Sequence, residues 1–500
     1  MEETGGNSVV NSNLSNISEN ENNLSLKTVD TPLKWCSVSL SDVISRGKRL
    51  EAAAYDVLGK AAIQTIQNSK FGFINLLSNN GIVKTAYHAP RFKRNYVEKN
   101  SQNSVGFLGS SEMLEIKPTA DKFITKALAD KLDLFVNKET VLMSCSGTIG
   151  KVSFVNTSLA QFAFSQHIIK IICHKYSGYI YTCILNDLVQ KQIQSLIYGS
   201  VIQEIEPEHL EKVIIPNAPN EMKERIHNLI VESYSLRDES NELIDEATNL
   251  LIEELKLPSI SELEKSSAKS SANVNAFSIK LSNLAGRVDA SYHLPIVDTI
   301  VEHLKKYAKE VTTIGDQRIS KQIILAGVFK RTYVEEEYGY PFLGGKEITQ
   351  LSPKTEKYLS KPIHKKRYEK ELKVTENTIL VTDRGTIGTT AIVPKHWDGY
   401  AVSQNVLKLV PTNNKIAGYI YIFLNSEWGT ELVRRQTYGS VVDMIDNNSL
   451  SSVEIPLLKN QDIQNKINDL ALEANQKRYE AYMLEQEALK IMNEEVIYAK

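Results

Sequence analysis

The chain has 500 residues, too many for a single hydrophobic core, so we expect two globular domains with connecting elements. Its four cysteines, Cys36, Cys145, Cys173 and Cys183, form no Cys-x-x-Cys pair and have no accompanying histidine spacing, which argues against a zinc site or a disulfide framework. The net charge of −2 gives no direct sign of nucleic-acid binding, no secretory signal is recognised, and no apolar run approaches the ~20 residues of a membrane-spanning helix, so a cytoplasmic protein is expected.

The first part of the chain divides into a tail and a globular body. Residues 1–32 are rich in Asn, Ser and Glu and poor in large apolar side chains, which predicts a flexible tail. A first globular domain is expected at 33–217, opening with a β-type run at Trp35–Leu40. Three β-branched segments predict strands later in this domain, at Thr140–Ser144, Lys151–Val155 and His167–Ile172.

A long helical period follows at 218–257, with Asn220 as its expected N-cap. Apolar residues alternate there at steps of three and four, which is the heptad seam of a coiled coil, and the same seam returns at 458–500. The seam residues expected to pack are Ile226, Leu229, Leu236, Leu243 and Leu250 in the first helix, and Ile467, Leu470, Leu484 and Ile491 in the second.

Each helix would span roughly 50 Å, and a long acidic helix needs a partner for its apolar stripe. The economical partner is the other helix, packed antiparallel so that the two globular domains are related by a pseudo-two-fold axis. Small residues interrupt both seams at equivalent places, Ser233 with Ala474 and Ser240 with Ala481, and would allow close backbone approach. The alternative is that each helix folds back on its own domain.

A linker and a second globular domain lie between the two helices. The segment 258–276 is dominated by Ser, Ala, Lys and Glu after Pro258, which predicts the linker. The second domain is expected at 277–457. Its β-branched segments predict strands at Thr378–Thr382, Thr389–Val393 and Val406–Val410.

The second domain repeats the first. Gly147-Thr148-Ile149-Gly150 returns as Gly385-Thr386-Ile387-Gly388, an offset of 238 residues, and the glycines of this turn permit positive φ or close backbone approach. Further blocks recur in the same order, so that chance is excluded: Phe92–Val97 as Phe329–Val334, Phe107–Gly109 as Phe342–Gly344, Ser165–Gln166 as Ser403–Gln404, Tyr179–Tyr181 as Tyr419–Tyr421, and Tyr198–Val201 as Tyr438–Val441.

Two of these blocks carry groups suited to phosphate contacts. The Phe-Lys-Arg-x-Tyr-Val block joins two cations to an aromatic ring, or else forms a solvated charged face. The Tyr-Gly-Ser-Val block offers backbone N–H groups and a hydroxyl to a phosphate, or else only ends a strand. Arg384 replaces Ser146 before the glycine turn, so equivalent loops differ chemically, and if they face bases the two domains should read different sequences. The candidate DNA-contacting residues are Lys93, Arg94, Tyr198, Gly199, Ser200, Lys330, Arg331, Arg384, Tyr438, Gly439 and Ser440.

The charge is distributed unevenly along the chain. Against the overall −2, residues 221–255 carry −7, residues 462–496 carry −4 and residues 1–30 carry −4, which leaves +13 for the rest, mainly the two globular domains. A basic balance is the electrostatic footprint of a phosphate-binding surface, although scattered lysines would give the same sum.

The order of these motifs resembles the specificity subunit of type I restriction-modification systems. Gly-Thr-Ile-Gly is followed by Ser-Gln, by Tyr-Gly-Ser, by a closing strand at Val213–Pro216 or Val453–Pro456, and by a long helix. The resemblance covers about 33–257 and 277–497. It implies a mixed α/β (α+β) fold in which two tandem target-recognition domains are separated by spacer helices packed as an antiparallel coiled coil.

The resemblance also implies a function and partners. The chain would be a non-catalytic reader of double-stranded DNA, with one domain on each half of a split, asymmetric site. Its helices would dock two adenine-N6 methyltransferase subunits and, through them, ATP-driven motor-nuclease subunits. No cofactor is expected in this chain, since S-adenosylmethionine, ATP and Mg would bind to the partner subunits, and no membrane is involved.

The chain carries no sign of a catalytic centre of its own. It has neither a methyltransferase Asn/Asp-Pro-Pro-Tyr/Phe tetrapeptide with a Gly-rich cofactor loop nor a Walker-type Gly-x-x-x-x-Gly-Lys-Ser/Thr. Two other functions stay open. One is a DNA-binding specificity component of a methyltransferase-only or other phage-defence complex, and the other is a protein-assembly scaffold.

Overall fold

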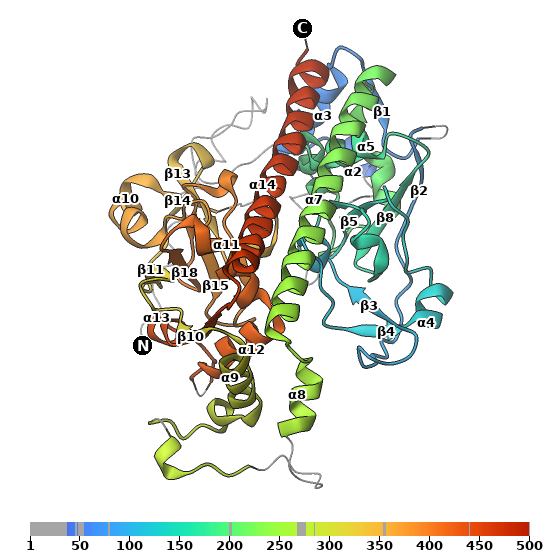
Figure 1. Cartoon of the computed structure of the whole chain (residues 1–500). Coiled ribbons are helices and arrows are strands. Elements are labelled where there is room, and N and C mark those ends of the chain that lie inside the picture. The colour runs from blue at the N-terminus through green and yellow to red at the C-terminus, as the bar shows by residue number, and fades with distance from the viewer. Residues whose placement is uncertain are drawn as a thin grey trace, which may run out of the picture.

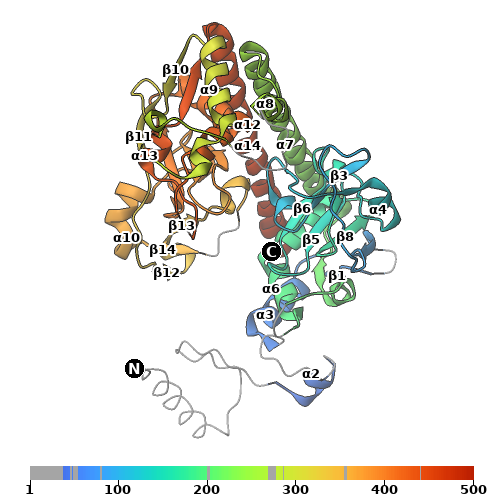
Figure 2. The ribbon, with the colours of Figure 1, turned by 90° about the horizontal axis from the view of Figure 1, so that it is seen from below.

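The computed structural model consists of two mixed α/β bodies on either side of a pair of long helices (Figure 1). A second view shows the same separation of the bodies by the helix pair (Figure 2). The predicted tail and Cys36 lie outside the residues that the structure describes. These described residues are 38–45, 48, 55–78, 81–199, 203–267, 277–284, 286–353, 357–439 and 441–499.

The first body is built on a four-stranded antiparallel sheet in the order β2-β8-β5-β6 and a three-stranded sheet in the order β4-β3-β7, in which β3 and β7 are parallel. A short β1-β9 pair closes it. Its elements are α2 (Leu40–Ser45), α3 (Val57–Gln67), β1 (Phe73–Asn75), β2 (Val83–Tyr87), β3 (Ser104–Leu108), β4 (Phe123–Thr125), α4 (Lys126–Lys131), β5 (Val141–Ser144), β6 (Val152–Phe154), β7 (Ala163–Phe164), β8 (Ile168–Cys173), α5 (Ser177–Leu185), α6 (Asp187–Leu196) and β9 (Ile214–Pro216).

The second body repeats this plan with sheets in the orders β11-β18-β15-β16 and β12-β14-β13-β17, and a β10-β19 pair. Equivalent register shifts occur in β2 and β11, next to Val83 and Ser320. Its elements are α9 (Pro295–Tyr307), β10 (Glu310–Thr313), β11 (Ser320–Ile324), β12 (Tyr333–Val334), β13 (Gly339–Leu343), β14 (Tyr358–Ser360), α10 (Lys361–Arg367), β15 (Ile379–Thr382), β16 (Thr390–Ile392), β17 (Ala401–Val402), β18 (Val406–Pro411), α11 (Asn414–Asn425), α12 (Glu427–Arg435), α13 (Asn447–Ser451) and β19 (Glu454–Leu457).

The six strands predicted from β-branched content are confirmed as β5, β6, β8, β15, β16 and β18. The predicted run at Trp35–Leu40 is wrong at its described end, because Leu40 begins helix α2. Leu40, Val43 and Ile44 have helical rather than strand spacing, and the Val43 N–H bonds to the Ser39 carbonyl at 3.1 Å.

The predicted linker contains helix α8 (Ile260–Ser267), while 268–276 lies outside the described residues. A capping box starts this helix. The Ser259 hydroxyl accepts from the Glu262 N–H at 3.3 Å, and the Glu262 carboxylate accepts from the Ser259 N–H at 2.9 Å. This Ser-x-x-Glu signal was present in the sequence, and it gives the helix its start within a polar segment.

The two long helices are α7 (Asn220–Leu255) and α14 (Gln461–Ile491), and they pack antiparallel. Arg225 near the start of α7 meets Glu495 after the end of α14 at 3.2 Å, and Lys466 near the start of α14 meets Glu246 at 2.8 Å. The expected N-cap at Asn220 is wrong. Pro219 holds that position, and Asn220 is the first helical residue.

The buried surface of each helix is wider than a two-helix seam. Ile226, Ser233, Ser240 and Ala247 of α7 are fully buried, whereas the alternate seam positions Leu229, Leu236, Leu243 and Leu250 are half-buried. In α14, Ile467, Leu470 and Ile491 are buried and Leu484 is half-buried. The extra apolar positions pack on the globular bodies, so the two packing modes that the sequence left open occur together.

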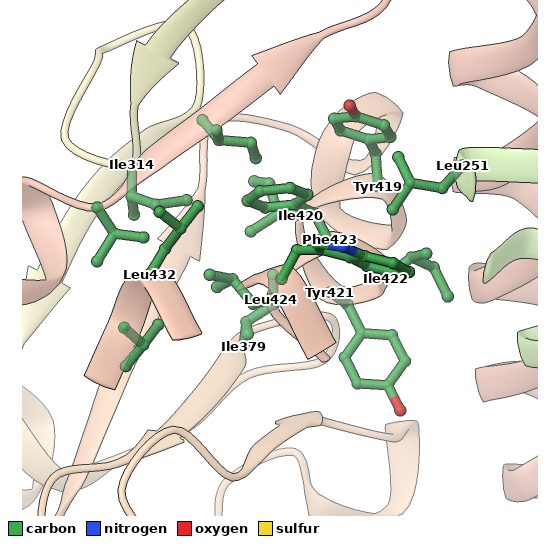
Figure 3. Close-up of a cluster of buried hydrophobic side chains, with 14 of the residues drawn as sticks. Leu251, Ile314, Ile379, Tyr419, Ile420, Tyr421, Ile422, Phe423, Leu424 and Leu432 are labelled. Atoms are coloured by element: carbon green, nitrogen blue, oxygen red, sulfur yellow. The ribbon is translucent and has the colours of Figure 1, made fainter. Parts of the chain in front are cut away.

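Each helix contributes to the cores of both bodies. The first half of α7 joins the core of the first body through Ile226, and its second half joins the core of the second body through Leu251. The end of α14 joins the first core through Ile491. Figure 3 shows the second core, in which Leu251 lies beside Tyr419, and the cluster continues from there through further side chains of that body: Ile379, Ile420, Phe423, Leu424, Leu432 and Ile314.

Small residues let the backbones approach closely, as the sequence predicts. The Ser233 hydroxyl donates to the Ala481 carbonyl of the other helix at 2.7 Å, and both residues are fully buried. Gly418 of α11 lies so close to α14 that a Cβ atom there would be 2.2 Å from the Asn468 carbonyl oxygen. The Gly418 N–H donates to the Asn468 side chain at 2.9 Å. These contacts fix the helix pair relative to the bodies.

Candidate nucleic-acid interface

In each body, the repeated blocks converge on one end of the four-stranded sheet. The Gly-Thr-Ile-Gly turn joins β5 to β6, and the Ser144 hydroxyl at the end of β5 donates to the Thr148 carbonyl at 2.5 Å and accepts from the Lys151 N–H at 2.9 Å. Gly147 and Gly150 have φ of +77° and +86°. A side chain would be strained there, so the glycines are needed for this turn.

The second body builds the equivalent turn between β15 and β16. The Thr382 hydroxyl donates to the Thr386 carbonyl and accepts from the Thr389 N–H at 3.1 Å. Gly385 and Gly388 again have positive φ, +74° and +88°. The repeated sequence therefore encodes one rigid turn, placed twice.

The Tyr-Gly-Ser block lies beside this turn. Tyr198 and Glu204 exchange two backbone hydrogen bonds of 3.0 and 2.9 Å, and Glu204 also bridges to Ser146 before the turn. Gly199 has a φ of +100°. Ser200, predicted to donate its hydroxyl, lies outside the described residues.

The same loop recurs in the second body. Tyr438 and Met444 exchange hydrogen bonds of 2.9 and 2.8 Å, and Met444 bridges to Arg384. Gly439 has a φ of +129°, and a Cβ atom there would be 2.2 Å from the Val442 carbonyl oxygen, so this position excludes other residues. Ser440 lies outside the described residues.

The Ser-Gln block connects the turn to the smaller sheet. The Cys145 N–H bonds to the His167 carbonyl at 2.9 Å, and the Ser165 N–H bonds to the Leu108 carbonyl at 3.0 Å. Gln166 and its equivalent Gln404 each have a buried side-chain oxygen without a hydrogen-bond partner among the described residues. The same polar atom is thus buried and unpaired in both copies, which is uncommon in folded proteins.

The cation block lies on the smaller sheet, and its lysines are free to reach solvent. Lys93 and Lys330 are exposed, while Arg94 and Arg331 are half-buried. The Arg94 guanidinium lies 5.8 Å from the Phe107 ring centroid, and the Arg331 guanidinium lies 5.3 Å from that of Phe342. Each arginine is thus held by a cation–π contact from a second repeated block.

The tyrosines of the cation block contact other side chains. Tyr96 lies under Lys122 at 5.6 Å, and Tyr333 packs against Phe342 with ring centroids 6.1 Å apart. The rings that contact the arginines are the phenylalanines of the Phe-Leu-Gly block. These phenylalanines are distant from the arginines in the sequence, so the contact could not be predicted from the sequence.

A polar network joins the segment just before the cation block to the Tyr-Gly-Ser loop in the first body. Arg91 pairs with Glu204 at 3.1 Å, His88 contacts Glu206 at 2.6 Å, and the Tyr198 hydroxyl donates to Glu206 at 2.7 Å. The hydrogen bonds from Tyr198 and His88 lower the pKa of Glu206. Sequence comparison between the copies missed His88, Arg91 and Glu204, because their chemistry does not recur in the second domain, whereas Glu206 recurs as Asp446, which is hydrogen-bonded to Tyr438.

Arg384 is the polar centre of the equivalent surface in the second body. It pairs with its neighbour Asp383 at 2.8 Å, and the Asp383 carboxylate is fully buried. Burial raises the pKa of Asp383, and the adjacent guanidinium opposes that shift. Arg384 itself is half-buried, so part of its guanidinium group is accessible to solvent. Tyr438 beside it is 41% exposed.

The two bodies also touch each other directly beside the helices. The Ile116 N–H donates to the Thr349 carbonyl at 2.9 Å, and Glu115 forms an isolated antiparallel bridge with Gln350. Glu115 and Gln350 occupy equivalent positions in the two copies, so this contact lies on the pseudo-two-fold axis. A cavity of about 380 Å³ adjoins it. Burial raises the pKa of Glu115 to about 7.

Over the described residues, no group of three or more His, Cys, Asp or Glu side chains is arranged to hold a metal ion. None of the described helices is both long enough and apolar enough to cross a bilayer.

Comparison with known proteins identifies the family to which the chain belongs. The model of the type I restriction modification DNA specificity domain matches residues 34–232 and 325–471. No curated protein matches the chain. Three solved structures are similar at low superposition quality, too low to carry an argument. They are the S subunit of a type I restriction-modification system from M. genitalium (14% identity, 84% of this chain and 96% of that chain, TM-score 0.29), the HsdS subunit from Thermoanaerobacter tengcongensis (13%, 84% and 95%, 0.26), and a chain from work on complex assembly and conformational transition of the type I R-M system (13%, 82% and 98%, 0.26).

Proposed function

Because the chain belongs to the type I restriction modification DNA specificity family, and is therefore the non-catalytic DNA specificity subunit of such a system, we propose that it reads a split, asymmetric site with one body on each half. Its two long helices set the distance between the halves. The same helices dock two adenine-N6 methyltransferase subunits, which bind S-adenosylmethionine. Motor-nuclease subunits, which bind ATP and Mg, join through the methyltransferases.

The observation that carries this proposal is the convergence of four repeated blocks at one sheet end in each body. Arg331 on Phe342 and the exposed Lys330 supply positive charge beside the rigid glycine turn. The first body presents the same arrangement with Lys93 and Arg94. Cations fixed on a rigid frame suit phosphate contacts, which position a protein on a duplex without reading its sequence.

The proposed reading of unlike half-sites rests on the differences between the two surfaces. Ser146 stands where Arg384 stands in the second copy, and Glu204 stands where Met444 stands. Groups of different hydrogen-bonding character prefer different base edges. One subunit can therefore read two different half-sites through two copies of one frame.

The helix pair suits the proposed spacing role. Helix α7 has 36 residues, which corresponds to a rise of roughly 54 Å. Two readers on one face of a duplex lie about one helical turn, roughly 34 Å, or a multiple of it apart. Half-buried leucines, Leu236 and Leu484, leave apolar surface on the helix pair, which favours it as the docking place for the methyltransferase subunits.

The test is to purify the chain with type I methyltransferase subunits from the same host and to measure composition and DNA binding. Native mass spectrometry should give two methyltransferase subunits for each copy of this chain. Duplex binding should weaken steeply as salt rises, because phosphate contacts release counterions. A complex that assembles and never binds duplex DNA would overturn the DNA-reading function in favour of a protein-assembly scaffold.

A further inference from the structure

Each long helix holds one body at two places along its length. The first place lies near the helix start and is alike in both copies. The Gly178 N–H donates to the His227 side chain of α7 at 3.1 Å, and the Gly418 N–H donates to the Asn468 side chain of α14 at 2.9 Å. His227 and Asn468 are 241 residues apart, the offset that relates the two heptad seams. The second place lies about three turns, or roughly 16 Å, further along each helix.

In the first body, the second place consists of hydrogen bonds to α7. The Asp238 carboxylate accepts from the N–H groups of Thr157 and Ser158, at 2.8 and 3.0 Å, and from the Ser158 hydroxyl at 2.6 Å. The Asn241 amide donates to the Ile116 carbonyl at 2.9 Å, and Asn241 is only 4% exposed. We call Ser158, Asp238 and Asn241 the first clamp.

In the second body, the equivalent place consists of aromatic rings stacked on α14. The His396 and Tyr482 rings stack with centroids 4.0 Å apart and planes 9° apart, and the Tyr479 ring lies 6.2 Å from that of His396. Lys395 lies over the Tyr479 ring at 5.2 Å. The His396 Nε2–H donates to the Leu351 carbonyl at 2.8 Å. We call His396, Tyr479 and Tyr482 the second clamp.

The two clamps occupy equivalent positions with unlike residues. Ser158 corresponds to His396, Asp238 to Tyr479 and Asn241 to Tyr482, and the carbonyls that they hold, Ile116 and Leu351, are equivalent as well. Neither set can replace the other. A tyrosine has no carboxylate to accept two backbone N–H groups, and an aspartate or asparagine has no ring on which a histidine can stack. A change on each body is therefore matched by a change on its helix.

The clamps also hold the segments through which the two bodies touch. The Ile116 N–H donates to the Thr349 carbonyl, and Leu351 follows Gln350, which bridges to Glu115. The two touching segments are thus tied to different helices. A body attached at two separated points of one helix, and also to the other body, cannot turn about any one of these attachments. Its orientation on the helix pair is therefore fixed.

Orientation matters on a duplex, because each added base pair changes both the distance and the direction of a half-site. One base pair moves a half-site by roughly 3.4 Å and turns it by roughly 35° about the duplex axis. We propose that the two clamps are positioning elements that hold each body at one orientation and so restrict the complex to one spacing between half-sites. This inference rests on the proposed function, in which the helices set the distance, and it adds the residues that set the angle.

The test compares duplexes that differ only in the number of base pairs between the half-sites. The purified complex of this chain with its methyltransferase subunits is bound to duplexes with the native spacing and with one base pair more or fewer. The unaltered complex should prefer the native spacing by at least about tenfold, because a misplaced half-site loses its base contacts. Asp238→Ala combined with Asn241→Ala should reduce this preference to less than about threefold. Glu242→Ala, at an exposed position of the same helix, is the matched control and should keep the full preference.

An exchange of chemistry in the second clamp tests the matching between body and helix. Tyr479→Asp combined with Tyr482→Asn removes the rings on which His396 stacks, and it should loosen the spacing in the same way. Adding Lys395→Thr and His396→Ser gives the second clamp the chemistry of the first. This four-residue exchange should restore the spacing preference to within about threefold of that of the unaltered complex.

A duplex with one half-site scrambled separates positioning from folding. Every clamp variant should bind it within about twofold of the unaltered complex, because the base contacts of a single body are unchanged. Full spacing preference in the loosened variants would overturn the inference. A large loss on the scrambled duplex would overturn it too, since the clamp residues would then only support the fold of a body.

The inference also fails if the four-residue exchange binds the scrambled duplex normally and does not restore the spacing preference. Failure of the unaltered complex to bind any duplex would instead reject the proposed function itself, which keeps the two failures apart.

Discussion

At the scale of single residues, the two copies share the side chains that fix the frame and differ at several positions that face solvent. Arg94 and Arg331 lie on equivalent phenylalanine rings, and Ser144 and Thr382 lock equivalent turns. These residues recur in the sequence, so they could be found from the repeat alone. Arg91 has no counterpart in the second copy, and only the folded chain brings it to Glu204.

Replacing Lys330 and Arg331 by alanine should weaken binding to all duplexes by a similar factor. Lys330 is exposed and Arg331 is held over Phe342, so both suit phosphate rather than base contacts. The slope of log affinity against log salt should become shallower by about 2. Mobility-shift titrations at several salt concentrations measure both effects.

Lys415→Ala provides the control for that double variant. Lys415 is exposed at the start of α11, at the opposite end of β18 from Gln404, and its loss should leave the salt slope unchanged. A defect of the double variant confined to one DNA sequence would mean that Lys330 and Arg331 read bases.

Glu115 predicts a pH-dependent stability. Burial raises its pKa from 4.5 to about 7, so the protonated form is favoured in the folded protein. Its favourable contribution is present below about pH 4.5 and is lost as the pH rises through 7. Glu115→Gln, which copies the neutral Gln350 across the axis, should therefore raise the free energy of unfolding at pH 8 by about 2 kcal/mol after allowance for partial exposure.

Urea unfolding of wild type and variant at pH 5 and pH 8 measures this effect. The advantage of the variant should be large at pH 8 and small at pH 5. Glu98→Gln, at an exposed position, should show no such dependence. An equal effect of Glu115→Gln at both pH values would contradict the burial of an ionisable group at the contact between the bodies.

At the scale of elements, the heptad pattern correctly predicted that the two long helices pair. Only every second seam position of α7 is fully buried, however. Ile226 and Ala247 are fully buried, whereas Leu229 and Leu243 are half-buried. The reason is that α7 packs on both bodies as well as on α14, and a seam pattern describes only one partner. Helix α8 illustrates the opposite case, in which a local capping box outweighed a linker-like composition.

The close approach of the helices predicts a severe effect of bulk at Ser233. Its hydroxyl donates to the Ala481 carbonyl at 2.7 Å, and both residues are fully buried, so there is no room for a larger side chain. Ser233→Leu should push the helices apart and lower the free energy of unfolding by about 1–3 kcal/mol or more. Ser235→Leu, two residues away on the exposed face, is the control and should change stability by less than about 0.5 kcal/mol.

Chemical unfolding measures the stability of the Ser233 variant. Native mass spectrometry with the methyltransferase subunits measures its assembly. The Ser233 variant should lose methyltransferase subunits, because the docking surface of the helix pair is distorted. Intact stability in that variant would show that the helices tolerate a wider separation than the structure has.

At the scale of the whole molecule, three sets of contacts fix the separation of the two bodies. The helix pair is one, the packing of each helix into both cores is the second, and the bridge between Glu115 and Gln350 is the third. The repeat in the sequence predicted two bodies and paired helices. The direct bridge could not be predicted from the sequence. Glu115 and Gln350 are different residue types, and they come together only when the two bodies pack about the pseudo-two-fold axis.

The account as a whole claims that one chain holds two chemically different DNA readers at a constant distance. Single-molecule sequencing of modified adenines in a host that carries the intact system, compared with the same host lacking this chain, tests that claim most directly. We predict a chain-dependent motif of two unlike half-sites separated by a constant number of unspecified base pairs. A continuous or palindromic motif, or a motif that persists without the chain, would contradict it.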